Sequence, residues 1–336
     1  MAVPRLPCRA VPATAEACQD RHVNDSEPPG TPPVVAVDAS IGAVTRGAYL
    51  CDRHLWAAAT GLSDERFADH LALLGVRALV LDPAVVDGDG PGGRIPALSA
   101  RLAGHGIATY AAAESLEAPD PAPQDAAPQD AAPRRPVDIV GDLTRGELPP
   151  VLGLDVALGA QFVGTRVVRD GDGQVRDVAR TLATAALLLP GAWLMRGGDE
   201  LGLTGPRSGL TGDAAELLVA DLDSARSITA HLRRIAAHRP AGAAEVTPVD
   251  TGIDDDEAIA YRVDRREGRP YLVVANLGRS VAVVELGPAG SGKEGRTVAK
   301  RIASGAVAAT LVTHEDTAVG DGGLRLAPWE SRVYPL

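Results

Sequence analysis

Apolar and polar positions follow two different periods along this chain. Over most of its first 240 residues, short apolar runs of strand length stand between segments with the three-to-four-residue spacing of amphipathic helices. After Glu257 the spacing shortens, and apolar runs of strand length are separated by turn residues. The pattern therefore predicts an α/β body followed by an antiparallel β region.

A helix-then-strand unit is clearest near residue 70. Helical spacing over residues 63–74 places Phe67 and Leu71 on one face, and Ser63 is a candidate N-cap. The apolar run VRALVL at 76–81 follows directly and has the composition of a buried strand. This segment predicts a helix that leads into a strand of a parallel sheet.

The same unit recurs along the first half of the chain. A second helix is predicted over 95–104 and a second strand over 107–110, and the apolar run VVAV at 34–37 is a further buried strand. Alternation of helices with apolar strands favours an α/β architecture with a parallel sheet.

The second half begins with helices and ends with strands. An apolar helix is predicted over 175–189, a buried strand over 192–195, and an amphipathic helix over 224–238 with Ser224 at its cap. Short strands then follow in the segments IAYRV, PYLVVANL, VAVVEL, VAATLV, LRLA and RVYP.

Two segments lack apolar periodicity. Residues 1–32 are rich in proline, alanine and charge, and residues 119–136 contain a tandem APQDA repeat in a proline-rich context. Such segments bury too little apolar surface to offset the entropy of ordering. We expect a disordered tail and an exposed insertion, both open to proteolysis.

Composition limits the function classes. The chain of 336 residues carries 33 basic and 44 acidic residues, a formal charge of −11, which disfavours nucleic acid and anionic lipid as partners. No apolar stretch is long enough to span a membrane, and no signal peptide is recognisable. Three cysteines, Cys8, Cys18 and Cys51, do not form a disulfide framework. We expect a soluble cytoplasmic protein.

Four parts of the chain carry a resemblance to one known family. They are LLLPGAWLMRGGDELGL at 187–203, HLRRIAAHR at 231–239, the strand segments at 258–278 and 326–336, and ERFADHLALLGVRALVLDPAV at 65–85. Together they resemble the α-amylase family, glycoside hydrolase family 13. In this resemblance the first two are similar to the last barrel strand with its acidic loop and to the helix that follows. The strand segments resemble the C-terminal β-sandwich, and the last segment resembles the second helix and strand of the barrel.

The resemblance implies a partial or degenerate (β/α)8 TIM-type barrel over residues 33–244, followed by an antiparallel β-sandwich over 245–336. Residues 33–244 are fewer than the roughly 250 of a complete barrel, and they include the proline-rich insertion. About two barrel units are therefore expected to be missing or reduced.

The resemblance also indicates candidate catalytic residues. Retaining glycosidases need a carboxylate nucleophile and a carboxylic acid about 5–5.5 Å apart. Asp38, in VVAVDAS, resembles the family's nucleophile, but the arginine expected two residues earlier is Ala36. Glu114 is a candidate general acid if the strand before it is the fifth of the barrel, and an exposed linker glutamate if that strand is the third.

A third family carboxylate has no counterpart here, because residues 162–168 read FVGTRVV. Asp199 and Glu200 stand in the well-matched GGDELG loop, at the carboxyl end of a strand, where barrel active sites lie. The resemblance implies that this loop supports the barrel or rims the sugar site. These two residues are the candidate substrate-binding residues.

Other motifs have structural explanations. GPAGSGKE at 287–294 resembles a phosphate-binding loop, but Glu294 replaces the hydroxyl that should meet Mg²⁺, which favours a solvent turn. The seven histidines show no metal-ligand spacing, and no metal or cofactor is expected. Trp193 and Trp329 are expected in the core.

Two functions remain open from the sequence, and a third, nucleotide binding, is the weakest because it rests only on the imperfect phosphate-loop match at 287–294. The first is a non-catalytic, α-amylase-like protein, a pseudoenzyme that binds an α-glucan or other carbohydrate or serves as a scaffold. The second is an active retaining α-glucan hydrolase or transglycosylase with a diverged front half. The sequence lacks the third carboxylate of the family and the arginine that should accompany Asp38, which favours the first function. Function is decided by the residues of a site rather than by a fold.

Overall fold

The computed structural model of the chain describes just over half of its residues. These are residues 32, 34–35, 47–89, 93–113, 115–116, 141, 172–190, 193–198, 200, 227–239, 244–252, 257–286, 300–302, 304, 306–313 and 324–336. The predicted tail, apart from Pro32, and the predicted insertion at 119–136 lie outside the described residues.

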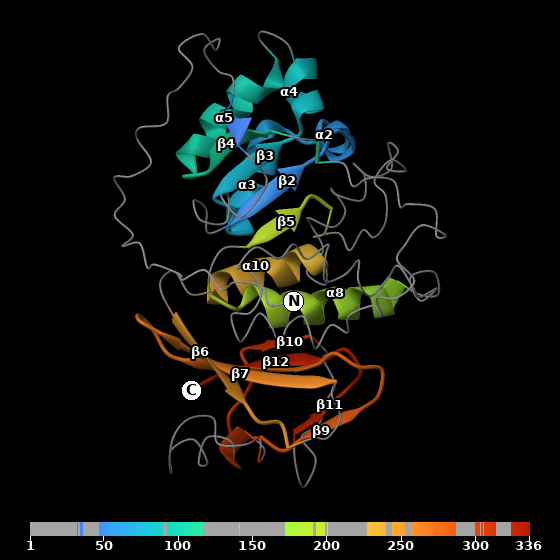
Figure 1. The fold of residues 1–336 in the computed structure, drawn as a ribbon, viewed down its shortest axis with the longest axis vertical. Coiled ribbons are helices and arrows are strands. Elements are labelled where there is room, and N and C mark those ends of the chain that lie inside the picture. The colour runs from blue at the N-terminus through green and yellow to red at the C-terminus, as the bar shows by residue number, and fades with distance from the viewer. Residues whose placement is uncertain are drawn as a thin grey trace, which may run out of the picture.

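A five-stranded parallel sheet forms the upper part of the molecule (Figure 1). Its strand order is β1-β4-β3-β2-β5, and every neighbouring pair is parallel. The strands are β1 (Val34–Val35), β2 (Ala48–Cys51), β3 (Ala78–Leu81), β4 (Ala108–Ala112) and β5 (Leu194–Arg196).

Helices connect and cover these strands, as the alternating pattern predicts. Helix α3 (Asp64–Leu73) stands between β2 and β3 in the order of the chain. Its N-cap is Ser63, whose hydroxyl accepts a 3.2 Å hydrogen bond from the Arg66 N–H. Helix α5 (Arg94–Gly104) lies between β3 and β4. Two short helices, α2 (Arg53–Ala59) and α4 (Pro83–Asp89), follow β2 and β3. The predicted helix-strand units are confirmed.

Strand β2 was not predicted, although it lies between β3 and β5 within the sheet. Its four residues, AYLC, are all buried. Four apolar residues directly before a helix cannot be assigned to a strand by periodicity, because a buried helical turn has the same composition.

Two long helices lie below the parallel sheet. Helix α8 (Asp172–Leu187) matches the predicted apolar helix, and α10 (Ile228–His238) matches the predicted amphipathic one. The N-cap of α10 is Ser227 rather than Ser224, because the Ser227 hydroxyl accepts a 2.9 Å hydrogen bond from the Ala230 N–H. Ile228, Leu232 and Ile235 form the buried stripe of α10.

The C-terminal part consists of antiparallel strands, as the change of period near Glu257 predicts. One sheet has the order β10-β12-β8-β7-β6, and β9 pairs with β11. The strands are β6 (Ala244–Val249), β7 (Ala258–Arg265), β8 (Tyr271–Asn276), β9 (Ala282–Val284), β10 (Leu311–Val312), β11 (Leu324–Leu326) and β12 (Ser331–Pro335).

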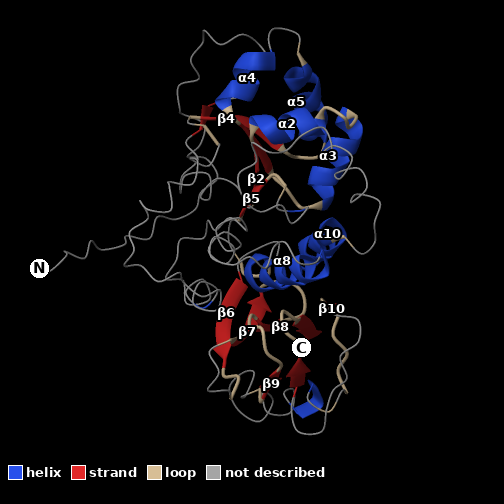
Figure 2. Ribbon diagram, turned by 90° about the vertical axis from the view of Figure 1, so that its right-hand side faces the viewer, coloured by secondary structure: helices blue, strands red, loops and turns tan. Residues whose placement is uncertain are grey.

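Helices α8 and α10 lie between the parallel and antiparallel sheets in both views (Figure 1, Figure 2). One hydrophobic cluster runs through all three layers, from Phe67 of α3 through Leu182 of α8 to Val273 of β8. The Tyr261 hydroxyl donates a 2.7 Å hydrogen bond to the carbonyl of Ala185, which ties β7 to α8. The α/β part and the antiparallel part therefore share one core.

A second cluster lies on the opposite face of the antiparallel sheet. It joins Leu272 and Val274 of β8 to Val284, Leu324 and Leu326 of β9 and β11. The two antiparallel sheets therefore bury apolar side chains against each other.

The described architecture is mixed α/β, in agreement with the predicted class. Within the described residues the parallel sheet is open, with β1 and β5 at its edges, and does not close into a barrel. No described helix is long and apolar enough to cross a bilayer.

Candidate functional site

The carboxyl ends of the parallel strands carry three described carboxylates. Asp52 follows β2, Asp82 follows β3, and Glu200 follows β5. All three side chains are buried. Since ligand sites of parallel α/β sheets lie at this edge, these groups are the first candidates for chemistry.

Asp52 and Asp82 are engaged in local backbone structure. Oδ1 of Asp52 accepts a 2.8 Å hydrogen bond from the Leu55 N–H at the start of α2. Oδ1 of Asp82 accepts from the Ala84 N–H at 2.8 Å, while its Oδ2 accepts from the Leu116 N–H at 2.6 Å and the Ser115 hydroxyl at 3.0 Å. Asp82 therefore caps α4 and fixes the segment that follows β4.

Glu200 is bonded to parts of the fold that lie far apart in the chain. Its Oε1 accepts a 2.5 Å hydrogen bond from the Tyr49 hydroxyl on β2, and its Oε2 accepts one of 2.7 Å from the Gly198 N–H. Its backbone carbonyl accepts a 3.1 Å hydrogen bond from the Thr229 hydroxyl on α10. One residue thus joins β2, the turn after β5, and α10.

His70 extends this network to α3. Its Nδ1 lies 3.4 Å from Nη2 of Arg233, and because a guanidinium can only donate, Nδ1 is the acceptor of this contact. Nε2 lies 3.6 Å from Oε1 of Glu200, too long for a good hydrogen bond but close enough for electrostatic attraction. The Glu200 cluster, defined as Tyr49, His70, Gly198, Glu200 and Arg233, therefore contains residues from four parts of the fold.

The cluster favours the ionised form of Glu200. Complete burial raises the pKa of its carboxyl group, but His70 and the Tyr49 hydroxyl stabilise the carboxylate and leave the pKa below its ordinary value of 4.5. A buried carboxylate that is ionised and fully bonded stabilises the local structure. It is poorly placed to act as a proton donor near neutral pH.

The turn after β5 requires glycine. A Cβ atom at Gly197 would lie 1.9 Å from Cδ2 of Leu55 and 2.9 Å from the Leu50 carbonyl oxygen. Gly198 has φ 95°, in the region that favours glycine. This close approach brings the Gly198 N–H to the Glu200 carboxylate.

Gly197→Ala is expected to lower the free energy of unfolding by about 1–3 kcal/mol, because the added methyl group overpacks the turn against Leu55 of α2 and the Leu50 carbonyl of β2. Urea unfolding followed by circular dichroism measures the change. Gly104→Ala in α5 is the matched control, since a Cβ there meets no atom within 4 Å. The control is expected to be neutral or stabilising by up to about 1 kcal/mol. Equal effects of the two substitutions would contradict the close-approach explanation.

Of the four candidates from the sequence, only Glu200 is described. Its side chain is fully buried and hydrogen-bonded within the protein. Asp38, Glu114 and Asp199 lie outside the described residues.

The partners of Glu200 are not predicted by the sequence. Tyr49 and Glu200 are 151 positions apart, and His70 and Arg233 are 163 apart, so no local pattern joins them. One signal was available for His70. It lies three residues after Phe67 and one before Leu71, on the apolar face of α3, where a polar side chain needs a buried partner.

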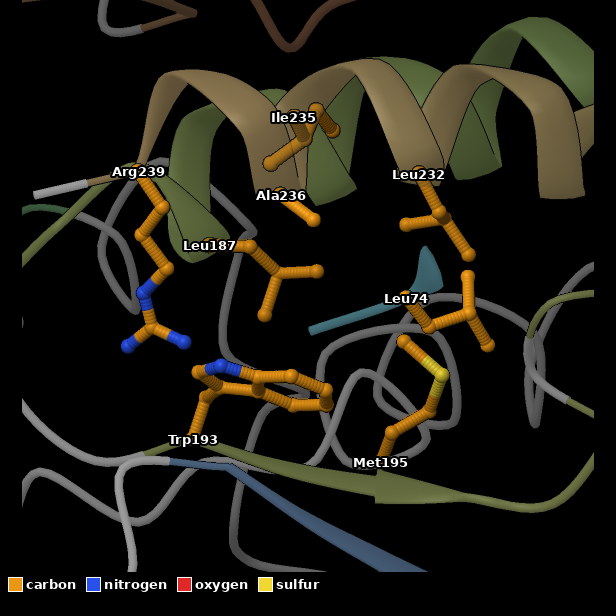
Figure 3. A pocket seen from close by; sticks show the side chains of 8 residues that line it. All are labelled: Leu74, Leu187, Trp193, Met195, Leu232, Ile235, Ala236 and Arg239. Carbon is orange, nitrogen blue, oxygen red and sulfur yellow. The ribbon is translucent and has the colours of Figure 1, made fainter. Parts of the chain in front are cut away.

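Figure 3 shows a small hollow between β5 and the two lower helices. Its lining is Leu74, Leu187, Trp193, Met195, Leu232, Ile235, Ala236 and Arg239. The Arg239 guanidinium lies 5.4 Å from the centroid of the Trp193 ring. Apart from Arg239 and the indole N–H, the lining side chains offer no hydrogen-bonding group, so this hollow does not suit a sugar.

The tryptophans are used for packing. Trp193 and Trp329 are buried in the main cluster, as predicted. Trp56 is half-buried, and the Arg94 guanidinium lies 5.2 Å from its ring centroid. Among the described residues, no group of three His, Cys, Asp or Glu side chains is arranged to hold a metal ion.

No protein-family model matches the chain, and no curated protein matches it. Several solved structures are similar to it. Trehalose-6-phosphate hydrolase (TreA) from Bacillus licheniformis is 16% identical, with a TM-score of 0.40 over 59% of this chain and 46% of that one. A mutant of the same hydrolase in complex with PNG gives 14% identity and a TM-score of 0.43, over 78% of this chain and 65% of that one.

Trehalulose synthase MutB is similar to the same degree. A mutant crystal soaked with trehalulose gives 15% identity and a TM-score of 0.42, over 81% of this chain and 68% of that one. The chain spans about half the length of the hydrolase named first.

Proposed function

We propose that the protein is a carbohydrate-related, α-amylase-like pseudoenzyme that binds an α-glucan or a similar sugar without hydrolysing it. One observation carries the proposal: each of the three described carboxylates at the carboxyl edge of the parallel sheet is buried and bonded within the protein. In the sequence, FVGTRVV stands where the resemblance expects a further carboxylate. The residues that support the loop are therefore present, whereas a catalytic set of carboxylates is not recognisable.

Asp199 is the proposed sugar contact. In the sequence it stands between Gly198 and Glu200. The Gly198 N–H donates a hydrogen bond to the Glu200 carboxylate, and the Thr229 hydroxyl donates one to the Glu200 carbonyl, so both neighbours are held in place. A rigid flanking structure suits a binding residue, because less conformational freedom is lost when a ligand binds. In this proposal Glu200 supports the substrate-binding loop from within the core.

The proposed architecture is a reduced barrel over residues 33–244 and a β-sandwich over 245–336, with residues 1–31 and 119–136 unpacked. Pro32, the last residue of the predicted tail 1–32, is buried, so the tail is shorter than predicted. The shared core and the second apolar cluster support this arrangement. The same proposal places the protein in the cytoplasm. Its alternative form, for a protein that binds no sugar, is a scaffold role towards a protein partner.

A second function, retaining glycoside hydrolysis, is favoured by one observation. Strands β1 and β4 are parallel neighbours with Val35 opposite Ala112. Asp38 follows Val35 by three residues and Glu114 follows Ala112 by two. Both candidate carboxylates therefore follow the carboxyl ends of adjacent strands within two or three positions of the sequence. Retaining hydrolysis requires such a pair about 5–5.5 Å apart.

Enzyme assays separate the two functions. We expect no significant turnover of maltooligosaccharides, trehalose, sucrose or aryl α-glucosides by the purified protein. A rate that is abolished by Asp38→Asn or Glu114→Gln, and retained in Glu245→Gln on exposed β6, would establish the second function instead. Loss of a catalytic carboxylate commonly costs several orders of magnitude in rate, so the outcome is clear.

Calorimetric titration with maltooligosaccharides then tests the binding proposal. We expect measurable binding that Asp199→Ala weakens about tenfold or more, because a charged hydrogen bond contributes roughly 1.5–3 kcal/mol. Glu245→Ala is the control and should bind like the unaltered protein. Absence of binding would refute the sugar-binding proposal and leave the scaffold variant.

A further inference from the structure

The contact between helices α8 and α10 contains a buried histidine that the proposed function does not use. His231 of α10 is fully buried, and its Nε2 lies 2.8 Å from the hydroxyl oxygen of Thr184 on α8. The same hydroxyl donates a 2.8 Å hydrogen bond to the Arg180 carbonyl. Both helices lie between the parallel and the antiparallel sheet (Figure 2). A titratable ring is therefore buried in the layer that joins the two sheets.

Only the neutral form of the His231 ring fits this position. A protonated imidazole carries N–H groups at both nitrogens. Nε2–H can donate to the Thr184 oxygen, whereas Nδ1 is buried and has no hydrogen-bond partner among the described residues. The second N–H of a protonated ring would lack an acceptor there, which is costly for a charged group.

The charges around His231 oppose protonation. Burial, together with the cations of Arg234 on α10 and Arg180 on α8, lowers the pKa of His231 from 6.5 to about 3, against an opposing effect of the Arg180 carbonyl. Asp177, the carboxylate of α8 near Arg180, lies 4.0 Å from that guanidinium and is partly exposed. Arg265 of β7 donates to the carbonyl of the last residue of α10, two turns from His231. No described carboxylate acts on the ring.

Two other titratable groups contact α10 on the side away from His231. His70 of α3 contacts Arg233, and the Glu200 carbonyl accepts a hydrogen bond from the Thr229 hydroxyl. Positions 229 and 233 are each two residues from 231, which places them about 200° around the helix. These groups therefore face the parallel part and do not balance a charge on the His231 ring.

Each of the two helices is bonded to a different sheet. α8 is bonded to the antiparallel sheet by the Tyr261 hydroxyl, which donates to the Ala185 carbonyl. α10 is bonded to the parallel part by the Thr229 hydroxyl, which donates to the Glu200 carbonyl. Between the helices lie apolar side chains of the main core and the hydrogen bond of His231. The helices can therefore separate while each stays with its own sheet.

We propose that the contact between α8 and α10 is an acid-sensitive joint, which opens when His231 is protonated while the two sheets stay folded. In the open form water reaches Nδ1, and the ring takes up one proton with the affinity of an exposed histidine. Arg265 keeps the last turn of α10 on β7, so the helices separate at the end where His231 lies. Because the closed form binds this proton more weakly, a fall in pH below about 6.5 stabilises the open form.

Hydrogen exchange of the full-length protein tests the joint. After correction for intrinsic exchange rates, the amides of α8 and α10 should be less protected at pH 5 than those of β3 and β8. The opening constant of the helices should rise about thirtyfold between pH 7.5 and pH 5, because only the open form binds the proton in this range. Equal protection of helices and sheets would show that only global unfolding exposes His231, and it would overturn the proposal.

His231→Gln removes the titration, and its side-chain amide can still donate to Thr184. In this variant the opening constant of the helices should change less than about threefold over the same pH range. His238→Gln is the matched control, because this ring lies on the same helix and is partly exposed. The control should keep the thirtyfold rise. A thirtyfold rise that persists in His231→Gln, or that is lost in both variants, would overturn the proposal.

A measurement on the unaltered protein does not depend on the folding of either variant. Nitrogen-15 spectra of the histidine rings report the protonation of each ring, and His231 is assigned by its contact with Thr184. We expect this ring to be neutral in the closed form at pH 5. A protonated His231 ring at pH 5 in a protein whose α8 and α10 amides remain protected would refute the joint.

Discussion

Glu200→Ala is expected to lower the free energy of unfolding by about 3–5 kcal/mol. The substitution removes the acceptor of the hydrogen bonds from the Tyr49 hydroxyl and the Gly198 N–H, and it leaves both donors buried. Breaking a buried charged network by removing one member commonly costs this much. Chemical denaturation measures the loss. Glu245→Ala on exposed β6 is the matched control and should change stability by less than about 0.5 kcal/mol.

The same cluster predicts a pH dependence. The pKa of Glu200 in the folded protein lies below its ordinary value of 4.5, so the ionised carboxylate stabilises the fold above about pH 4.5. This contribution is lost as the pH falls through the folded-state pKa. The difference in stability between the unaltered protein and Glu200→Gln should therefore be greatest near neutral pH and shrink below pH 4.5. A difference that is constant from pH 7 to pH 3 would contradict the ionised assignment.

Arg332→Met is expected to cost a similar amount, about 3–5 kcal/mol, in the antiparallel part. Nε of Arg332 donates a 2.7 Å hydrogen bond to Oε1 of Glu330, and Nη2 donates one of 3.0 Å to the Arg325 carbonyl. Both side chains of the ion pair are buried. Removal of the guanidinium leaves a buried carboxylate without its counter-charge, and the free energy of unfolding falls.

A double variant separates charge from packing. In Glu330→Gln/Arg332→Met no charge of this pair remains buried, and the side-chain amide introduced at position 330 can still accept the hydrogen bond that the Ala327 N–H donates to Glu330 at 2.6 Å. We expect the double variant to recover at least half of the loss. Arg262→Met is the control, because the Arg262–Asp264 pair of the same sheet is partly exposed and should contribute about 0–1 kcal/mol. A double variant less stable than Arg332→Met would contradict this explanation.

A strained turn lies directly before Glu330. Trp329 has φ 56°, which is costly for a residue with a side chain. The Trp329 ring lies in the main core, and its carbonyl accepts a hydrogen bond from the Thr181 hydroxyl on α8. The ring and the Thr181 hydrogen bond therefore hold this turn against α8, in the layer that joins the two parts of the protein.

Much of the local structure was determined by the sequence alone. Phe67 and Leu71 recur at helical spacing after Ser63, and α3 with its N-cap is found there. The apolar run at 76–81 and the segment at 107–110 correspond to β3 and β4, and the strands after Glu257 are present. These features depend on neighbours within one or two turns of the chain, which the period of apolar residues records.

How these elements combine depends on contacts between segments that are far apart in the chain. The placement of β1 beside β4 and of β5 beside β2 depends on pairing between segments far apart in the chain. The role of Glu200 depends on Tyr49, 151 positions away, and a glutamate in an acidic loop has the same local sequence whether it faces a ligand or the core. Burial and long-range hydrogen bonding set the charge and the accessibility of such a side chain, and neither is encoded in a local period.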